Sequence, residues 1–180
     1  ITYYDGTEGM LIANVSHFSN YTVRGDGAEI TIEYDLPSVG SWYLISVPVE
    51  VDSLAVTDLF GDLSGSYQVW GWNDGWVLNN NGVAIPLEGR DGITSLELGK
   101  GYWFKSTQAE IFNISGVIPS STKIELVGGS NWQLIGSPSD ANKNIDSLFG
   151  DYSTYQVWGW TTGWVLNNNG VAIPLEGRDG

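Results

Sequence analysis

One stretch of this chain occurs twice. Gly75–Gly92 reads GWVLNNNGVAIPLEGRDG, and Gly163–Gly180 is identical to it letter for letter. Just upstream, YQVWGW occurs at Tyr67–Trp72 and again at Tyr155–Trp160. Self-similarity at a fixed period is the signature of repeated structural units. The chain therefore folds as two related units, and any account of its function must serve both.

Weaker matches set the period. WYLISVP at Trp42–Pro48 corresponds to WQLIGSP at Trp132–Pro138, and EITIEY at Glu29–Tyr34 corresponds to TKIEL at Thr122–Leu126. Both copies begin with Ile-Thr and end with Glu-Gly-Arg-Asp-Gly, which predicts two repeats, 1–92 and 93–180. Within the first, residues 1–27 are interpreted either as the terminal strands of a preceding sandwich or as a segment donated to a neighbour.

Strand signals dominate both copies. Glu29–Leu36 alternates apolar and polar residues, with Ile30, Ile32 and Tyr34 on one face, as a half-buried strand requires. Trp42–Val49 is a nearly continuous apolar run, which favours a central strand. The sequence predicts an all-β fold of two tandem repeats of about 90 residues, each a small antiparallel β-sandwich or barrel.

A hairpin is expected where Tyr67–Trp72 and Trp76–Asn79 flank Asn73-Asp74-Gly75. The second copy has Thr161-Thr162-Gly163 there and retains only the glycine, which suits a three-residue loop. Trp72 would then stand opposite Trp76, and Trp160 opposite Trp164. Further short strands are predicted at Val83–Leu87, Gly101–Lys105 and Glu110–Ile114, and short helices at Ser53–Phe60 and Asn142–Phe149.

Charge and composition exclude several functions. The chain carries 7 basic and 21 acidic residues, a formal net charge of −14, so we expect neither nucleic acid nor membrane insertion among its interactions. It has no cysteine, and its single histidine, His17, lies in the least repeated segment. Some carboxylate pair always meets the spacing of a glycosidase in so acidic a chain. We therefore predict no enzyme, no catalytic residue and no cofactor.

Calcium is the one metal that the sequence suggests. Glu88 and Asp91, repeated as Glu176 and Asp179, stand in a glycine-rich turn of the kind that calcium sites use. The alternative is a turn closed by Arg90, and by Arg178 in the second copy, pairing with these acids.

Tryptophan is the most informative residue type. The candidate positions form pairs on alternating strand residues, so they either stack on sugar rings or fill a small β core across the hairpin. They are Trp70, Trp72, Trp76, Trp158, Trp160 and Trp164.

Three asparagines stand in Asn-x-Ser/Thr sequons and are candidate glycosylation sites: Asn14, Asn20 and Asn113. Asn20 and Asn113 fall at corresponding points of the two copies, which strengthens the prediction of a glycoprotein for these two.

The motifs WYLISVP, DLFGD, YQVWGW and LELGKGYWF, within Trp42–Phe104, resemble a β repeat of large secreted and surface proteins of bacteria and archaea. That repeat has Asn where this chain has Tyr43 and Gln133. ANVSHFSNYTV at Ala13–Val23 resembles the terminal strand of β-sandwich domains that precede such repeats. The resemblance implies an exported multi-domain context and names no ligand.

These observations predict a structural subunit of an extracellular assembly, such as a filament, sheath or surface layer. Copies of the chain would join head to tail by sharing strands, with Ile1, Thr2, Asp179 and Gly180 at the junction. A glycan-binding accessory or adhesion module of a larger secreted protein is the alternative, with polysaccharide as the partner.

Overall fold

The structure is a computed structural model, which describes residues 2–5, 10–15, 19–24, 29–119, 132–136, 144–149, 154–160 and 164–175. It divides into two units, Ile1–Ala141 and Asn142–Gly180. Strands and antiparallel pairings dominate both, and the two helices that are described have five residues each. The predicted all-β class is confirmed. Within the described ranges, no helix has the length and apolar character needed to cross a membrane.

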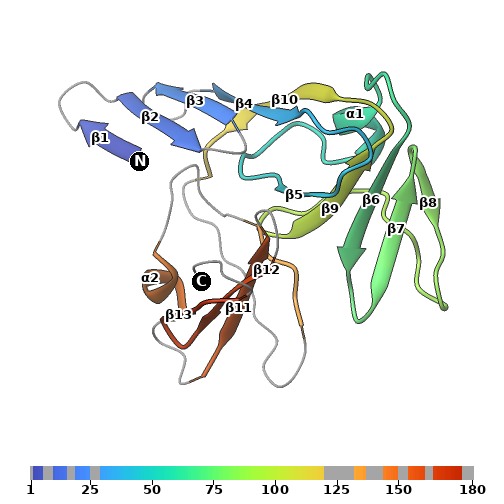
Figure 1. The fold of residues 1–180 in the computed structure, drawn as a ribbon. Coiled ribbons are helices and arrows are strands. Elements are labelled where there is room, and N and C mark those ends of the chain that lie inside the picture. Colours follow the sequence, from blue (N-terminus) through green and yellow to red (C-terminus); the bar gives the residue numbers. More distant parts are fainter. Residues whose placement is uncertain are drawn as a thin grey trace. The chain divides into compact units, whose positions relative to one another are not determined.

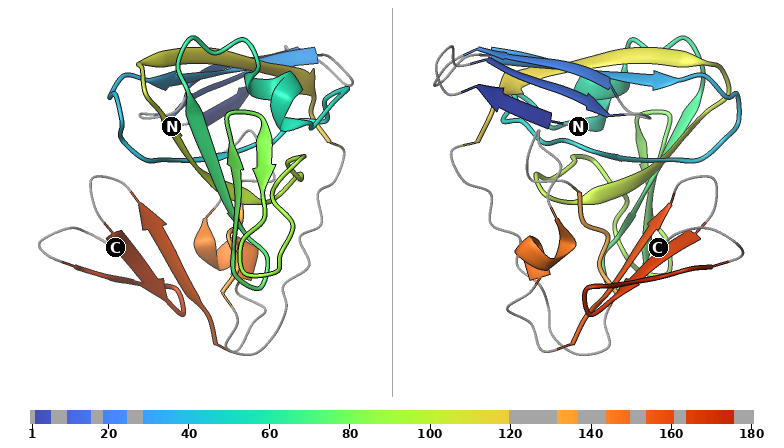
Figure 2. Two further views of the ribbon diagram at one scale, coloured as in Figure 1. Left: turned by 90° about the vertical axis from the view of Figure 1, so that its right-hand side faces the viewer. Right: turned by 60° about the vertical axis from the view of Figure 1, so that its left-hand side comes forward.

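The described residues of the first unit form eleven elements (Figure 1). In chain order they are β1 (Thr2–Asp5), β2 (Met10–Val15), β3 (Ser19–Arg24), β4 (Glu29–Leu36), β5 (Tyr43–Ser46), α1 (Val56–Phe60), β6 (Tyr67–Trp72), β7 (Trp76–Asn80), β8 (Val83–Ile85), β9 (Gly101–Ser106) and β10 (Glu110–Val117). They form three sheets, with the orders β1-β2-β3, β10-β4 and β5-β9-β6-β7-β8. β3 lies beside β4, as both figures of the whole chain show (Figures 1 and 2).

The second unit contains α2 (Ile145–Phe149), β11 (Gln156–Trp160), β12 (Trp164–Asn168) and β13 (Val171–Ile173). Its sheet has the order β11-β12-β13. The two predicted helices are thus present as α1 and α2, each shorter than expected, and β8, β9 and β10 match the predicted short strands.

Strand β4 has the predicted alternation. Ile30, Ile32 and Tyr34 are buried on one face, while its acidic residues are exposed on the other. β10 pairs with it antiparallel and alternates in the same way, with Phe112 and Ile114 turned inward. Two strands with matching period-2 patterns thus form one apolar surface.

One hydrophobic core joins this surface to the five-stranded sheet, and Phe60 of α1 belongs to it. The Phe60 ring is fully buried and contacts Tyr67 of β6, Phe104 of β9 and Phe112 of β10, with ring centroids 5.6, 5.1 and 5.3 Å away. Aromatic pairs at these separations add to the free energy gained from burial. The helix therefore places one aromatic side chain, Phe60, in contact with three strands.

The prediction that Trp42–Val49 is a central strand is wrong. Within the described residues, β5 stands at the end of its sheet order and has β9 as its neighbour on one side. The apolar run has another cause: after β5 the chain passes through the core, where Val47 and Val49 are fully buried. The hydroxyl of Tyr34 on β4 donates a hydrogen bond to the Ser46 carbonyl, which ties this segment to the other layer. An apolar run of this kind reports burial on both sides of the chain and does not specify how many strands flank it.

The folding unit is out of phase with the sequence period of 1–92 and 93–180. β9 belongs to the second period by sequence, yet it lies between β5 and β6 of the first. The link is anchored by Asn79, a fully buried side chain whose amide donates a 2.8 Å hydrogen bond to the Ile93 carbonyl and whose Oδ1 accepts one from the Gly82 N–H. Residues from 93 to 117 thus complete the first-period sheet and core.

The second-period copy of the β5 motif also contacts β9. The Gly101 N–H donates to the Leu134 carbonyl over 3.2 Å, and the Gly136 N–H donates to the Gly99 carbonyl over 2.9 Å. The backbones of 99–101 and 134–136 approach so closely that Gly101 and Gly136 have no room for a side chain. A Cβ on Gly101 would lie 2.7 Å from the Ile135 carbonyl oxygen, and one on Gly136 would overlap the Ser46 Cβ.

Candidate functional site

The hairpin of β6 and β7 has the predicted register. Trp72 stands opposite Trp76, and in the second unit Trp160 stands opposite Trp164. Asp74 and Gly75 both have positive φ, 50° and 142°, and the Asn73 N–H donates to the Gly75 carbonyl over 2.8 Å. A three-residue loop with glycine last is therefore confirmed for the first copy. The equivalent loop of the second copy, 161–163, lies outside the described residues.

The three tryptophans of this hairpin point away from the core. Core-facing positions of β6 are Tyr67 and Val69, whereas Trp70 and Trp72 are half-buried on the opposite, outer face. Trp76 on β7 is 42% exposed. Its ring meets those of Trp70 and Trp72 edge to face, with centroids 6.2 and 5.2 Å apart. This placement does not fit the interpretation that these residues fill a small β core.

Two further tryptophans, which the sequence analysis did not single out, extend this surface. Trp103 on β9 stands directly opposite Trp70. Trp42 is 40% exposed, and the ammonium group of Lys105 lies 5.2 Å from the centre of its ring. The five residues Trp42, Trp70, Trp72, Trp76 and Trp103 are called the tryptophan face below. The alternation of GYWFKS, with Tyr102 and Phe104 buried, was the signal that would have placed Trp103 there.

The strands under the tryptophan face carry almost no charge. None of the five strands β5–β9 contains an aspartate or glutamate, and Lys105 is their one charged residue. By contrast, Glu29, Glu33 and Asp35 lie exposed along β4. The nearby acids lie in the loops that join these strands, such as Asp74 in the 73–75 turn and Glu88, which pairs with Arg90. The strands that carry the face are thus apolar, aromatic and close to neutral.

The calcium candidates are only partly described. Glu88 forms an ion pair with Arg90, as the alternative to a calcium site predicted, and the Arg90 Nε donates to the Trp76 carbonyl over 3.3 Å. Residues 176–179, with the second set of candidates, lie outside the described residues. Within the described part of the chain, no group of three acidic, His or Cys side chains is arranged to hold a metal ion.

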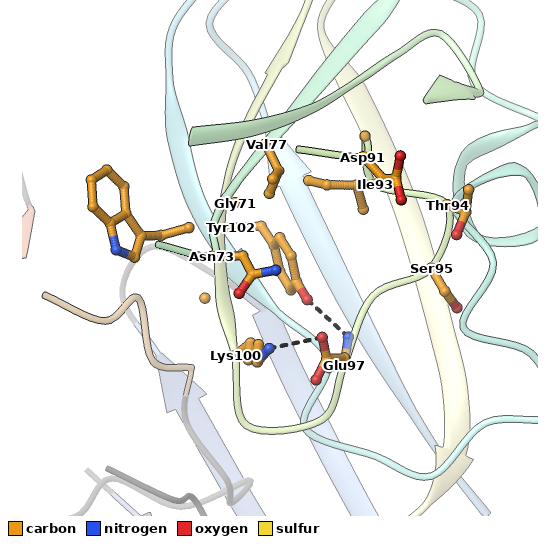
Figure 3. A pocket seen from close by; sticks show the side chains of 13 residues that line it. Gly71, Asn73, Val77, Asp91, Ile93, Thr94, Ser95, Glu97, Lys100 and Tyr102 are labelled. Atoms are coloured by element: carbon orange, nitrogen blue, oxygen red, sulfur yellow. Dashed lines mark hydrogen bonds and ion pairs between the residues drawn. The ribbon is translucent and has the colours of Figure 1, made fainter. Parts of the chain in front are cut away.

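Asp91 lines a pocket of about 210 Å³ at the end of the five-stranded sheet (Figure 3). Figure 3 shows Tyr102, Glu97 and Lys100 along its wall; the Glu97 N–H donates to the Tyr102 hydroxyl over 2.9 Å, and Lys100 pairs with the Glu97 carboxylate over 2.8 Å. Burial raises the pKa of Tyr102 to about 12. The polar groups are thus largely engaged with one another, and Tyr102 stays neutral at physiological pH.

The sequon asparagines lie on strands. Asn14 on β2 and Asn20 on β3 are direct cross-strand partners. Asn113 is an exposed position of β10, opposite Glu33, and Ser115 of its sequon hydrogen-bonds the Thr31 hydroxyl over 2.7 Å. Of the junction residues, Thr2 begins β1, while residues 1, 179 and 180 lie outside the described residues, as does residue 17, the histidine.

Comparison of the chain with family models, curated proteins and solved structures gives no match in any of the three. The fold and the tryptophan face therefore stand on their own geometry.

Proposed function

We propose that this protein is a structural subunit of an extracellular assembly, built from β-sandwich modules whose copies join head to tail by sharing strands. The observation that carries the proposal is the position of β9. A strand of the second sequence period, β9, stands second in the order of the first-period sheet, paired with Tyr43–Ser46 on one side and Tyr67–Trp70 on the other. Strand sharing between successive repeats is thus already the way in which this chain builds its first sheet.

The second-period sheet offers the same acceptor sequence. Tyr155–Trp158 repeats Tyr67–Trp70 letter for letter, and those are the residues of β6 that pair with β9. In the described part of the chain, β11 is the end strand of its sheet. Main-chain pairing along a sheet edge is a recurrent way in which one chain captures a strand of another.

The donor that we propose lies one period upstream of β9. Ile1 corresponds to Ile93, an offset of 93 − 1 = 92 residues, and this offset maps β9 onto residues 9–14. That range overlaps β2, an apolar strand that pairs with β1 and β3 within its own chain. In the proposed assembly, β2 of a second copy adds to β11 as β9 adds to β6. Such a contact is heterologous, so it propagates into a filament unless its rotation closes a ring.

An extracellular location agrees with other features of the chain. A net charge of −14 favours solubility, the absence of cysteine suits a prokaryotic surface protein, and Asn113 is an exposed sequon asparagine. The exposed sequon at Asn113 supports glycosylation as part of the proposal. The expected surface location supports a role in adhesion.

The proposal is tested by sedimentation velocity and negative-stain electron microscopy of the full chain over a range of concentrations. We expect concentration-dependent growth of linear particles. A chain that lacks residues 1–24 should remain monomeric by itself. When the intact chain is added in excess, the truncated chain should be found only at polymer ends. A full-length chain that stays monomeric at high micromolar concentration would refute the proposal, and so would polymers formed equally well without residues 1–24.

A further inference from the structure

We propose that the tryptophan face binds a neutral polysaccharide chain. This inference is independent of the assembly proposed above, because it uses a face of the five-stranded sheet, whereas strand sharing uses edges. Contiguous exposed apolar surface on a soluble domain marks a site of interaction. The tryptophan face has this character, with Trp42 and Trp76 each about two-fifths exposed.

The ring arrangement is held in place by the sheet itself. Trp76 packs edge to face against both Trp70 and Trp72, with interplanar angles of 79° and 90°. Tryptophan has only two side-chain torsions, and packing of this kind fixes them before a ligand arrives. A preorganised surface loses little conformational entropy on binding, which favours affinity for a ligand that offers only weak contacts.

The chemistry of the face selects sugars. The π face of an indole ring is negative and attracts the weakly positive C–H groups that line one side of a pyranose ring. Amide side chains stand on the same outer side of the strands: Gln68 on β6, next to Trp70, and Asn80 on β7. Together with the ammonium group of Lys105 they supply hydrogen-bond donors and acceptors for sugar hydroxyls.

Charge decides which polysaccharides fit. The chain has a net charge of −14, so its field repels anionic polymers, and the strands under the face have no carboxylate to hold a cationic one. Neutral glycans meet neither obstacle. The sheet order also sets a length, because β5 and β7 are three strand spacings apart, or roughly 14 Å at about 4.8 Å each. The face between Trp42 and Trp76 therefore suits several consecutive sugars.

The experiment measures binding of the full chain to soluble neutral polysaccharides, namely a β-glucan, a mannan and a xylan, by affinity gel electrophoresis and calorimetry. We expect at least one of them to bind, its oligosaccharides to bind more tightly with length, and its monosaccharide to give no measurable signal. Trp76→Ala and Trp42→Ala should each weaken binding about tenfold, which corresponds to about 1.4 kcal/mol.

Ile111→Ala is the matched control, because Ile111 is 66% exposed but lies on β10 and not on the five-stranded sheet. It should leave binding unchanged. Circular dichroism establishes that each variant is folded, and a polysaccharide-induced shift of wild-type tryptophan fluorescence gives a readout that needs no variant. The inference is overturned if none of the three polymers binds, if an anionic polymer binds better, or if the tryptophan variants lose no more affinity than Ile111→Ala.

Discussion

Phe60 and Phe149 hold the same position in the two copies of the repeat, but their surroundings differ. Phe60 is fully buried against rings from β6, β9 and β10. Phe149 is half-buried, and its described ring contact is with Tyr155, which corresponds to Tyr67 of β6, at 5.5 Å. The first core thus uses two aromatic residues from the following period, Phe104 of β9 and Phe112 of β10.

The difference teaches that the core around Phe60 draws on residues outside the first sequence period, namely Phe104 and Phe112. The hairpins β6–β7 and β11–β12 have the same register over the same residue types, so the local sequence suffices for the hairpin. The burial of Phe60 depends on β9 and β10, which the second sequence period supplies. Completing the second sheet with a β9-like strand should therefore make the two copies alike.

The largest expected effect comes from removing the two phenylalanines. Phe60→Ala should cost about 3–5 kcal/mol of unfolding free energy, the usual loss for a large aromatic residue in a packed core. Phe149→Ala in the monomeric chain should cost less, about 1–2 kcal/mol, because that side chain is half-buried. Urea unfolding followed by circular dichroism measures both. Equal losses would mean that the second core is already as complete as the first.

Alkaline pH should weaken the first unit through Tyr102. Burial raises the pKa of its hydroxyl to about 12 in the folded state, whereas the unfolded chain titrates near 10. The unfolded state therefore loses its proton first, so stability is full below pH 10 and falls by about 2–3 kcal/mol as pH rises to about 12. Tyr102→Phe should flatten this part of the stability curve, measured by urea unfolding at each pH. An unchanged slope in the variant would assign the loss to other groups, such as Tyr67, whose pKa burial also raises.

Gly136→Ser should destabilise the contact between the two β5 motifs. Serine is the residue that the first copy has at this position, Ser46, but a Cβ on Gly136 would lie 2.6 Å from the Lys100 carbonyl oxygen and would overlap the Ser46 Cβ. Overpacking of this kind costs about 1–3 kcal/mol. The thermal midpoint measures the loss, and Ser46→Gly in the same chain should recover part of it. A neutral Gly136→Ser would show that 132–136 is not held against β9 in solution.

Glu88→Gln should have the smallest effect. Its ion pair with Arg90 is at the surface, with the Glu88 side chain 82% exposed, so the loss should stay below about 1 kcal/mol. The same variant separates an ion pair from a calcium ligand. Calcium should leave the thermal midpoint of the wild-type chain unchanged; a rise with calcium that Glu88→Gln abolishes would restore the metal site.

The patterns that predicted this fold correctly were local ones. Alternation in Glu29–Leu36 and a glycine in the 73–75 loop depend on neighbours within a few residues, and the structure has both. The position of β5 was missed because an apolar run reports burial and not the number of strand neighbours. The sequence identified Trp70, Trp72 and Trp76 of the tryptophan face but not Trp42 and Trp103. Trp103 stands opposite Trp70 through a strand pairing 33 residues apart in sequence (103 − 70 = 33), which no local pattern specifies.

Strand sharing is tested most directly by placing single cysteines in this cysteine-free chain. Gln68 stands opposite Lys105 in the first sheet, and the repeat offsets map this pair onto Gln156 and Ala13. Chains carrying Gln156→Cys and chains carrying Ala13→Cys, mixed under mild oxidation, should form a disulfide-linked heterodimer, because directly opposed strand residues bring their Cβ atoms within bonding range. Ile12→Cys, which is one residue out of register with the mapped pair, should link far less. Equal yields for the two mixtures, or no heterodimer from either, would contradict the account.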